Sequence, residues 1–577
     1  MEQKITVWYD VETPMRDGVV LRANVYGPAD DRPYPAILLR FPYLKDSFEY
    51  KWGRLNPLPL ARAGYRVVVQ DCRGTGASQG EMDFDGPCQA RDGYDTVEWI
   101  AAQPWCDGGV GMYGLSYYGF TQLLTAEAQP PHLKAICPWQ QTGLYKYSGG
   151  FTTGSLHLMW LLERARDRLY SPEAAWSEDQ RETLRRTVEG YLGKFGQVVA
   201  YVPEGENPAA KIEGLPFLED YLRRIREYDD PACPAREGRP IDFSKFQVPC
   251  FFLGGWYDDT SKNGPLENWI ALGRTEAGRK LREKSRLLMG PWNHGEAMPD
   301  TVGWRAFGAQ AGYPMGRSIT EQLLRFFNWH LKGLDDGISQ EPPVTLFFMG
   351  ENRWEQAPAW PLPDTVTKAL YLSSSGHAAT KAEDGRLLTQ PETEPGQDTY
   401  ISDPANPVPA RAPGISSECQ DQSPIEARAD VAVYTSEPLT APLAAAGPVK
   451  AVLYVSSSCP DTDFACKLTE VFPDGRSLNI TDGAVRVSYG NTWERKLLTP
   501  GEIRPVEVLL GNTLNVFQPG SRIRLTVAGS MFPKFDRNHH LADRIGTSAD
   551  MVPAEDTIHH GGAYLSRLEL QVLERKS

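Results

Sequence analysis

The 577-residue sequence has few cysteines, and they form no ligand or redox motif. The nine cysteines are scattered along the chain, and no two of them have CxxC spacing. Sparse cysteine in a large chain is typical of proteins kept in a reducing compartment. We therefore expect a cytoplasmic protein.

Long apolar runs and basic charge are also lacking. No apolar run reaches the roughly 18–20 residues that span a bilayer, and the first ten residues, MEQKITVWYD, hold no apolar signal core. The formal net charge is −14, whereas nucleic-acid binding requires basic surface to neutralise phosphates. We expect neither a membrane nor a nucleic acid as partner.

Apolar residues are nevertheless abundant enough for large cores. Hydrophobic residues make up 41% and charged residues 23% of the sequence, proportions typical of a soluble globular protein. A chain of this length exceeds one ordinary core, which favours two or three domains.

Short apolar runs alternate with helical patterns in residues 1–142 and again in 241–335. Residues 4–27 alternate around Arg16-Asp17-Gly18 and predict an antiparallel hairpin. Alternating strands and helices predict an α/β fold with a mostly parallel sheet. The strands are expected at 35–40, 66–70, 110–113, 133–137, 249–254 and 286–289, and the helices at 89–103, 117–128 and 318–332.

Two segments have a different character. Residues 143–240 lack strand-like runs and show charged helical periodicity, which predicts a helical cap inserted over the strand ends of the sheet. Residues 336–577, beginning with runs such as VTLFFMG, alternate between turn signals and predict an all-β jelly roll. Within them, 376–420 is rich in Pro, Gly and Ser and is expected to be loop.

A candidate nucleophile lies between an apolar strand and a helix. Gly114-Leu115-Ser116-Tyr117-Tyr118-Gly119 follows VGMYG and precedes YYGFTQLLTAEA. A nucleophile elbow needs this strand-to-helix turn, which raises the serine hydroxyl above the sheet. A strict G-x-S-x-G would have Gly at 118, where Tyr118 stands, so the pattern alone is equally compatible with an ordinary loop serine.

An acid and a base follow later strands in the order that α/β-hydrolases use. Asp258 and Asp259 come directly after the strand at 249–254, and His294 lies in a Gly-flanked loop after the strand at 286–289. Alone, either aspartate could cap the next helix, and a loop histidine is usually structural. Together with Ser116, three strand ends in this order predict a Ser-His-Asp triad.

The end of an early strand supplies a candidate for the oxyanion hole. Tyr43 follows Arg40-Phe41-Pro42, and the donor other than the N–H after the serine normally comes from this region. A loop tyrosine taken alone is more often a packing residue.

Two further motifs are set aside. Arg73-Gly74-Thr75-Gly76 with Gly80 lacks the dinucleotide-binding spacing and is interpreted as a turn shaping the floor of the site. The pairs His539-His540 and His559-His560 lack carboxylate or Cys ligands at fixed spacing, so we expect no metal and no cofactor.

The chain resembles the CocE/NonD family, the cocaine esterase and X-prolyl dipeptidyl-peptidase group of serine hydrolases. The matching segments cover nearly the whole chain in order: RFPYLKD (40–46), VVVQDCRGTGASQGE (67–81), YGLSYYG (113–119), GGWYDDT (254–260), GPWNHG (290–295), PDTDFACKLTEVFPDGRSLNITDGAVR (460–486) and NVFQPGSRIRLTVAGSMFPKFDRN (515–538).

This resemblance implies an α/β-hydrolase domain, a helical cap and a C-terminal jelly roll, and a variant G-x-S-x-x-G elbow. It implies Ser116 as nucleophile, His294 as base and Asp258 as the residue that orients the base, with Asp259 as the alternative. It also implies that the Tyr43 hydroxyl and the Tyr117 N–H bind the oxyanion.

The expected reaction is hydrolysis of a small-molecule acyl ester, with an amide as a second option. X-Pro dipeptidyl-peptidase and α-amino-acid ester or β-lactam acylase activities remain open, as does a homodimer. In a different class, the chain could be a catalytically dead carbohydrate-binding or scaffold protein, since the jelly roll is also a carbohydrate-binding architecture.

Overall fold

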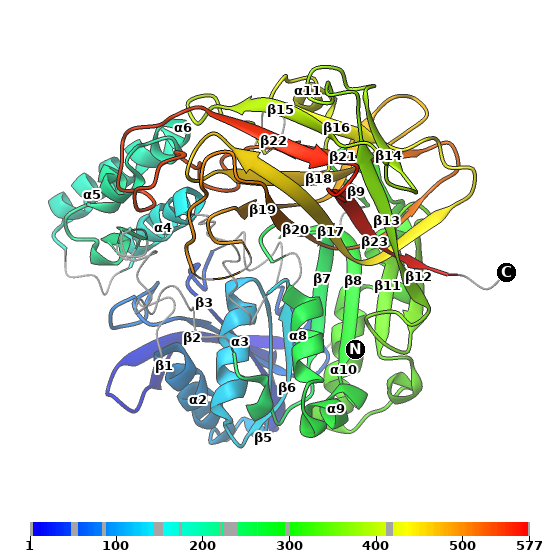
Figure 1. The fold of residues 1–577 in the computed structure, drawn as a ribbon. Helices are drawn as coiled ribbons and strands as arrows, with labels where there is room; N and C mark the ends of the chain where they lie inside the picture. The colour runs from blue at the N-terminus through cyan, green and yellow to red at the C-terminus, as the bar shows by residue number, and fades with distance from the viewer. Residues whose placement is uncertain are drawn as a thin grey trace.

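The alternating strands and helices of the N-terminal part assemble into one ten-stranded sheet (Figure 1). The computed structural model describes residues 4–47, 56–82, 88–141, 154–171, 176–219, 221–222, 225, 241–261, 264–294, 300–410, 419–490, 492 and 494–574. The strand order is β1-β2-β4-β3-β5-β6-β7-β8-β11-β12. All neighbours from β4 to β11 are parallel, and the outer pairs β1–β2, β2–β4 and β11–β12 are antiparallel.

The strands β1 to β8 lie close to the predicted ranges, and several extend beyond them, whereas β11 and β12 were not predicted for this sheet. The strands of the sheet are β1 (Ile5–Pro14), β2 (Val20–Pro28), β3 (Tyr34–Phe41), β4 (Arg66–Asp71), β5 (Cys106–Leu115), β6 (Leu133–Trp139), β7 (Phe251–Tyr257), β8 (Arg286–Asn293), β11 (Val344–Phe348) and β12 (Arg353–Ala357). The residues of β4, β7 and β8 are buried throughout, as expected for parallel strands covered on both faces.

In the part of the chain that the structure describes, six helices accompany this sheet. They are α1 (Leu58–Arg62), α2 (Cys88–Ala101), α3 (Tyr117–Ala128), α8 (Gly264–Leu272), α9 (Glu276–Glu283) and α10 (Ile319–Lys332). Three of them, α2, α3 and α10, lie at the positions that the sequence predicts. The last helix begins with a capping box formed by Ser318 and Glu321 and ends at Gly333 in the left-handed conformation. Both signals are local, which is why the sequence places this helix to within a residue.

The predicted helical insertion lies between β6 and β7 and has a core of its own. It contains α4 (Gly154–Leu169), α5 (Glu178–Leu192) and α6 (Phe195–Val199), and its buried residues form a separate cluster that includes Leu158, Leu162 and Tyr221. In Figure 1 these helices lie beside the C-terminal sheet and above the N-terminal part of the first sheet.

The C-terminal part forms an eleven-stranded, mostly antiparallel sheet around a third large core. Its path runs β15-β22-β17-β23-β13-β14-β16-β21-β18-β19, with β20 paired to β17. The strands are β13 (Thr365–Ser373), β14 (Gly385–Leu388), β15 (Gly396–Ser402), β16 (Val431–Thr435), β17 (Leu443–Ser457), β18 (Asp463–Val471), β19 (Ser477–Arg486), β20 (Arg504–Phe517), β21 (Arg522–Ala528), β22 (Ala554–His560) and β23 (Arg567–Leu573).

Two predictions for this part are wrong. The run VTLFFMG was placed in the jelly roll, but its strand β11 pairs in parallel with β8 and belongs to the first sheet. The stretch 376–420 was expected to be loop, but it contains β14 and β15. A short apolar run carries no information about its partner strand, and pairing in a sheet can override a turn-rich composition.

A buried polar contact joins a short strand that follows β8 to the C-terminal sheet. Arg305, in the short strand β10 (Arg305–Ala306), donates hydrogen bonds to Glu470 and Asn515 of the C-terminal sheet at 3.2 and 2.7 Å. All three side chains are buried. Among the helices of the described residues, none is both long enough and apolar enough to cross a membrane.

Candidate active site

The backbone at Ser116 has the conformation of a strained turn. Ser116 joins β5 to α3 with φ 58° and ψ −124°, a region that non-glycine residues seldom occupy. Its N–H donates to the Trp139 carbonyl at 2.9 Å, and its own carbonyl accepts from the N–H groups of Gly119 and Phe120. The turn therefore holds the side chain at the C-terminal edge of the parallel strands.

The packing around Gly119 and Tyr118 explains why the elbow does not need the strict G-x-S-x-G pattern. A Cβ on Gly119 would meet the Gln141 Cβ at 2.8 Å and the Trp139 carbonyl oxygen at 3.2 Å. Close packing of α3 against the end of β6 thus requires glycine at 119. The side chain of Tyr118 is buried and packs on Phe41, with ring centroids 4.8 Å apart, so position 118 has room for a large residue.

The structure brings Ser116, His294 and Asp258 into one hydrogen-bonded line. His294 Nε2 lies 3.0 Å from Ser116 Oγ, and His294 Nδ1 lies 2.9 Å from Asp258 Oδ1. Asp258 directly follows β7 and His294 directly follows β8, two neighbouring parallel strands. The carboxyl ends of such strands meet at one edge of the sheet, where ligands of α/β folds bind.

The local environment keeps the Asp258 carboxylate charged. Its side chain is only 1% exposed, and it accepts hydrogen bonds from the N–H groups of Thr260 and Ser261 and from the Ser261 hydroxyl. Burial alone would raise the pKa of Asp258, but the charge of His294 and the hydrogen bonds from His294 and Ser261 hold it below its usual range. The Asp258 carboxylate therefore accepts hydrogen bonds from the local N–H groups and also contacts the histidine.

Asp259, the alternative acid, lies elsewhere. Its Oδ1 is 3.3 Å from the Nζ of Lys534, which reaches over from the C-terminal part and also lies 2.5 Å from Asp482. The contact brings a C-terminal lysine next to the residue that follows Asp258. No sequence spacing indicated it, because the two positions are far apart in the chain.

The candidates for the oxyanion hole are Tyr117, which is part of the elbow, and Tyr43, in the loop after β3. Tyr117 is the first residue of α3 and directly follows Ser116, so its backbone N–H lies at the start of the elbow helix. The Tyr43 ring is 6% exposed and packs against the Tyr118 ring, with centroids 5.4 Å apart. The loop after β3 thus lies against the first turn of α3.

A buried ion pair holds the Tyr43 loop in place, and sequence reasoning missed it. Asp71 Oδ1 accepts from the Lys45 N–H at 2.6 Å, and Oδ2 accepts from the Ala77 N–H at 3.0 Å and lies 3.6 Å from Lys45 Nζ. Burial raises the pKa of Asp71 to about 6, against the lowering effect of Lys45. A Cβ on Gly76 would meet this carboxylate at 2.1 Å, so the glycine turn is built around Asp71.

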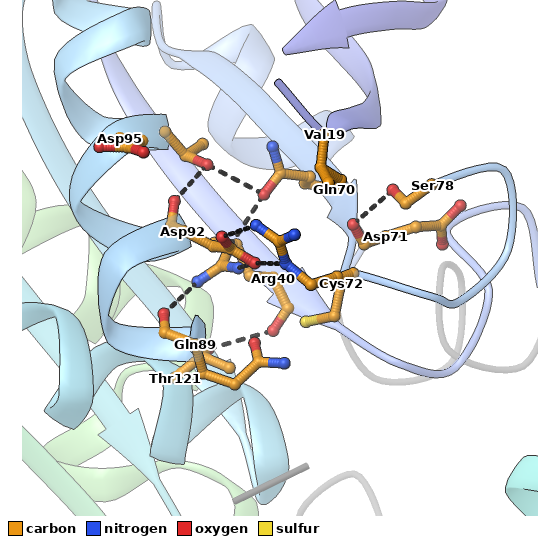
Figure 2. A network of polar contacts seen from close by, with 12 residues as sticks. Val19, Arg40, Gln70, Asp71, Cys72, Ser78, Gln89, Asp92, Asp95 and Thr121 are labelled. Carbon is orange, nitrogen blue, oxygen red and sulfur yellow. Dashed lines mark hydrogen bonds and ion pairs between the residues drawn. The ribbon is translucent and has the colours of Figure 1, made fainter. Parts of the chain in front are cut away.

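A second buried network ties the end of β3 to α2 and α3 (Figure 2). The Arg40 side chain is fully buried and donates to Gln70 Oε1 at 2.9 Å and to the Gln89 carbonyl at 3.0 Å. Thr121 of α3 donates its hydroxyl hydrogen bond to the Arg40 carbonyl at 3.1 Å. Arg73 of the glycine turn joins the same network through Asp92, at 2.6 Å.

The histidine pairs make hydrogen bonds to protein groups. His559 bonds to Ser456 and His540 to the Val552 carbonyl, and His539 contacts Glu204 of the helical insertion at 3.2 Å. Within the described part of the chain, no three His, Cys, Asp or Glu side chains gather as metal ligands would.

The helical insertion also adds side chains that the sequence did not single out. Trp160 and His157 of α4 stack with ring centroids 5.6 Å apart, and Trp160 lies 6.3 Å from the Tyr117 ring. The Arg164 guanidinium lies over the Tyr43 ring. The helical periodicity of α4 predicted its existence but not which of its residues face the elbow.

Comparisons with known proteins cover both parts of the chain. The family described as X-Pro dipeptidyl-peptidase (S15 family) matches residues 17–296, and the X-Pro dipeptidyl-peptidase C-terminal non-catalytic domain matches 336–569. Cocaine esterase of Rhodococcus sp. (strain MB1 Bresler) is 35% identical over 584 residues, covering 98% of each chain.

Two solved structures share the fold over nearly the whole length. An aminopeptidase from a marine sediment archaeon, Thaumarchaeota archaeon, has a TM-score of 0.80 at 23% identity, covering 100% of this chain and 97% of the other. An α-amino acid ester hydrolase has a TM-score of 0.79 at 24% identity, covering 99% and 97%. Both likenesses concern the fold.

Proposed function

This chain belongs to the CocE/NonD family of serine hydrolases and is a serine ester hydrolase, and from this premise we propose that Ser116, His294 and Asp258 carry out its chemistry. The observation that supports the assignment is the hydrogen-bonded line from Ser116 Oγ through both ring nitrogens of His294 to Asp258. Each ring nitrogen faces a different partner. One nitrogen can take the proton of the serine, and the other is bound by the aspartate, which orients the ring.

The proposed reaction proceeds through an acyl-enzyme. Ser116 Oγ attacks the acyl carbonyl carbon while His294 Nε2 takes the hydroxyl proton, and Asp258 stabilises the imidazolium that forms. The Tyr43 hydroxyl and the Tyr117 N–H donate to the carbonyl oxygen as it becomes negative. The bond to the leaving alcohol breaks as His294 returns the proton to it, and water then repeats the cycle and releases the acid.

We propose an ester with a hydrophobic or aromatic acyl group as the substrate. The aromatic rings of Trp160 and Tyr117 lie together beside the elbow, and apolar pockets with a few polar groups are typical of small-molecule sites. The X-Pro peptidase and α-amino-acid ester alternatives stay open as outcomes of a substrate panel of aryl esters, amino-acid esters and X-Pro amides.

A cytosolic location and a homodimer also remain proposals. The eight cysteines in the described residues are all free and buried, which is compatible with a reducing compartment.

The function is tested by labelling with a fluorophosphonate and by turnover of p-nitrophenyl esters. Ser116→Ala is expected to abolish both while leaving the melting temperature within a few degrees of the parent. A dead binding protein would not be labelled at all, and a variant that keeps more than a small fraction of the parent rate would refute Ser116 as nucleophile.

The C-terminal sheet offers a matched control. Ser374 lies 3.0 Å from His560 Nε2 and 2.7 Å from Asp398, so it also sits in a Ser/His/Asp cluster. However, Asp398 contacts the same ring nitrogen of His560, at 3.3 Å, so the histidine cannot relay a proton between them. Ser374→Ala is expected to leave labelling and turnover unchanged.

A further inference from the structure

The helical insertion places a buried cation on the face of the Tyr43 ring. The guanidinium carbon of Arg164, on α4, lies 4.3 Å from the centroid of that ring. Arg164 is 2% exposed and Tyr43 is 6% exposed. Cation–π attraction is strongest in such desolvated pairs, and arginine is always charged.

Neighbours on α4 hold the arginine in position. The Arg164 guanidinium forms an ion pair with Asp167, one turn further along the helix, at 3.1 Å, and lies 3.5 Å from Glu163. It also lies 5.7 Å from the centroid of the Trp160 ring. The cation is therefore anchored on its own helix and presented to the tyrosine from there.

The tyrosine ring is fixed from its other sides by the N-terminal part. The Tyr118 ring, two residues beyond Ser116, packs on it at 5.4 Å, and the Phe41 ring stacks at 6.3 Å. The backbone N–H of Lys45, two residues after Tyr43, is held by Asp71. The ring of Tyr43 is thus clamped between the elbow helix and the cap.

We propose that Arg164 is a positioning residue that strengthens the Tyr43 hydroxyl as a hydrogen-bond donor to the oxyanion. This inference rests on the proposed role of Tyr43. When the hydroxyl donates to an anion, electron density rises on the phenol oxygen and on the ring. The attraction between the ring face and the guanidinium then increases, because it is electrostatic. The interaction is stronger in the transition state than in the ground state, so it raises kcat.

A purely structural role predicts a different result. If Arg164 only fastens α4 to the Tyr43 loop, its loss lowers stability and loosens substrate binding regardless of the Tyr43 hydroxyl. The two roles therefore separate in a double-mutant cycle, which isolates the coupling between the two side chains.

The experiment measures kcat, KM and melting temperature on a p-nitrophenyl ester for R164M and R164K, each in the parent and in a Y43F background. R164M removes the charge and keeps a long apolar side chain, and it is expected to lower kcat about 3- to 30-fold with little change in KM. R164K keeps the charge and is expected to retain part of the rate. In the Y43F background the R164M effect is expected to fall below about twofold.

The neighbouring helix α5 provides a matched control, and a boronic acid provides a second readout. R186M removes a charge from Arg186, whose side chain is 76% exposed, and is expected to leave kcat unchanged. An aryl boronic acid forms a negatively charged tetrahedral adduct, so R164M should weaken its binding by the same factor as kcat, which keeps the proposal testable if turnover is too slow.

The outcomes separate the inference from its premise. If Y43F loses rate but R164M lowers kcat equally in both backgrounds, Arg164 has only a structural role and the inference falls alone. If Y43F stays within a few-fold of the parent, Tyr43 is not the donor, and both the oxyanion assignment and the inference are overturned. If R164K is as slow as R164M, the positive charge of Arg164 is not the property that raises kcat, and the inference is overturned.

Discussion

At the residue scale, the site depends on which of two adjacent carboxylates faces the histidine. Asp258 and Asp259 have the same side chain and follow the same strand, yet one contacts His294 and the other contacts Lys534. The local N–H groups of Thr260 and Ser261 explain the difference, because they bind the Asp258 carboxylate and fix its direction. The sequence favoured Asp258 only through a resemblance, since spacing alone allows either.

The pair of variants Asp258→Asn and Asp259→Asn tests this assignment. Asp258→Asn is expected to lower kcat by about 10³–10⁴, because an amide cannot stabilise the imidazolium and can hold the wrong tautomer. Since the pKa of Asp258 is held below its usual range, its carboxylate stays ionised through the neutral and mildly acidic range and adds no limb of its own to the pH–rate profile there. Asp259→Asn serves as the control and should stay within a few-fold of the parent in kcat. The reverse ranking of the two variants would assign the role to Asp259.

The residues that could be predicted from the sequence share one property. Ser116, Asp258 and His294 each stand at the end of an apolar strand, so a local pattern points to them, and the structure brings these three side chains together. Lys45 and Arg164 had no such signal. Asp71, the partner of Lys45, lies 26 residues away in the chain. Tyr43, the partner of Arg164, lies in another part of the fold. Tertiary packing decides such pairings.

At the element scale, the elbow depends on how closely α3 approaches β6. Helix α3 was predicted at 117–128 and occupies that range, because the strand-to-helix change and the apolar periodicity are both local. What the pattern could not explain was the glycine at 119 in place of 118. The tight contact with Gln141 and Trp139 supplies the reason, and it involves a strand twenty residues further along the chain.

Gly119→Ala tests this reason. The added methyl group would overlap the Gln141 Cβ and the Trp139 carbonyl, so α3 must shift, and overpacking of this kind typically costs about 1–3 kcal/mol. Because Ser116 directly precedes the same helix, kcat is expected to fall as well. Thermal unfolding and ester turnover measure both effects.

Gly190 provides the matched control for that substitution. It lies within α5, and a Cβ there would meet nothing within 4 Å. Gly190→Ala should therefore stabilise the protein by about 0.5–1 kcal/mol, since alanine is the better helix former, and leave kcat unchanged. If Gly119→Ala proves as harmless as Gly190→Ala, close packing does not explain the position of the glycine.

At the scale of the whole molecule, the partition of strands between the two sheets was the hardest feature to predict. The run VTLFFMG has the composition of a sandwich strand, yet β11 lies in the first sheet, between β8 and β12. Its neighbour Met349 then contacts β20 of the second sheet through backbone hydrogen bonds with Leu514 and Val516. The chain nevertheless stays in the first sheet through β12 and enters the second sheet only at β13. The boundary predicted at 336 remains a proposal.

The buried contact between the sheets also reaches the candidate site. Arg305 donates to Glu470 and Asn515 from the second sheet and to the Tyr257 hydroxyl at 3.3 Å. Tyr257 ends β7 and directly precedes Asp258. The pKa of Tyr257 is raised by burial, so its hydroxyl stays protonated and accepts the arginine's hydrogen bond. The second sheet thereby supports the strand that presents Asp258.

Glu470→Ala is the variant that tests this support. It removes the carboxylate partner of a buried guanidinium, and an uncompensated buried charge typically costs about 3–5 kcal/mol. We expect a large fall in melting temperature.

We also expect a lower kcat at a temperature where the variant is still folded, because Arg305 would shift and release Tyr257. As a control, Glu189→Ala breaks the exposed i,i+4 pair with Arg185 on α5 and should leave both the melting temperature and kcat nearly unchanged. If Glu470→Ala lowers the melting temperature but turns over at the parent rate, the contact joins the sheets without positioning Asp258. If neither quantity changes, the contact of Arg305 with Glu470 neither holds the two sheets together nor positions Asp258.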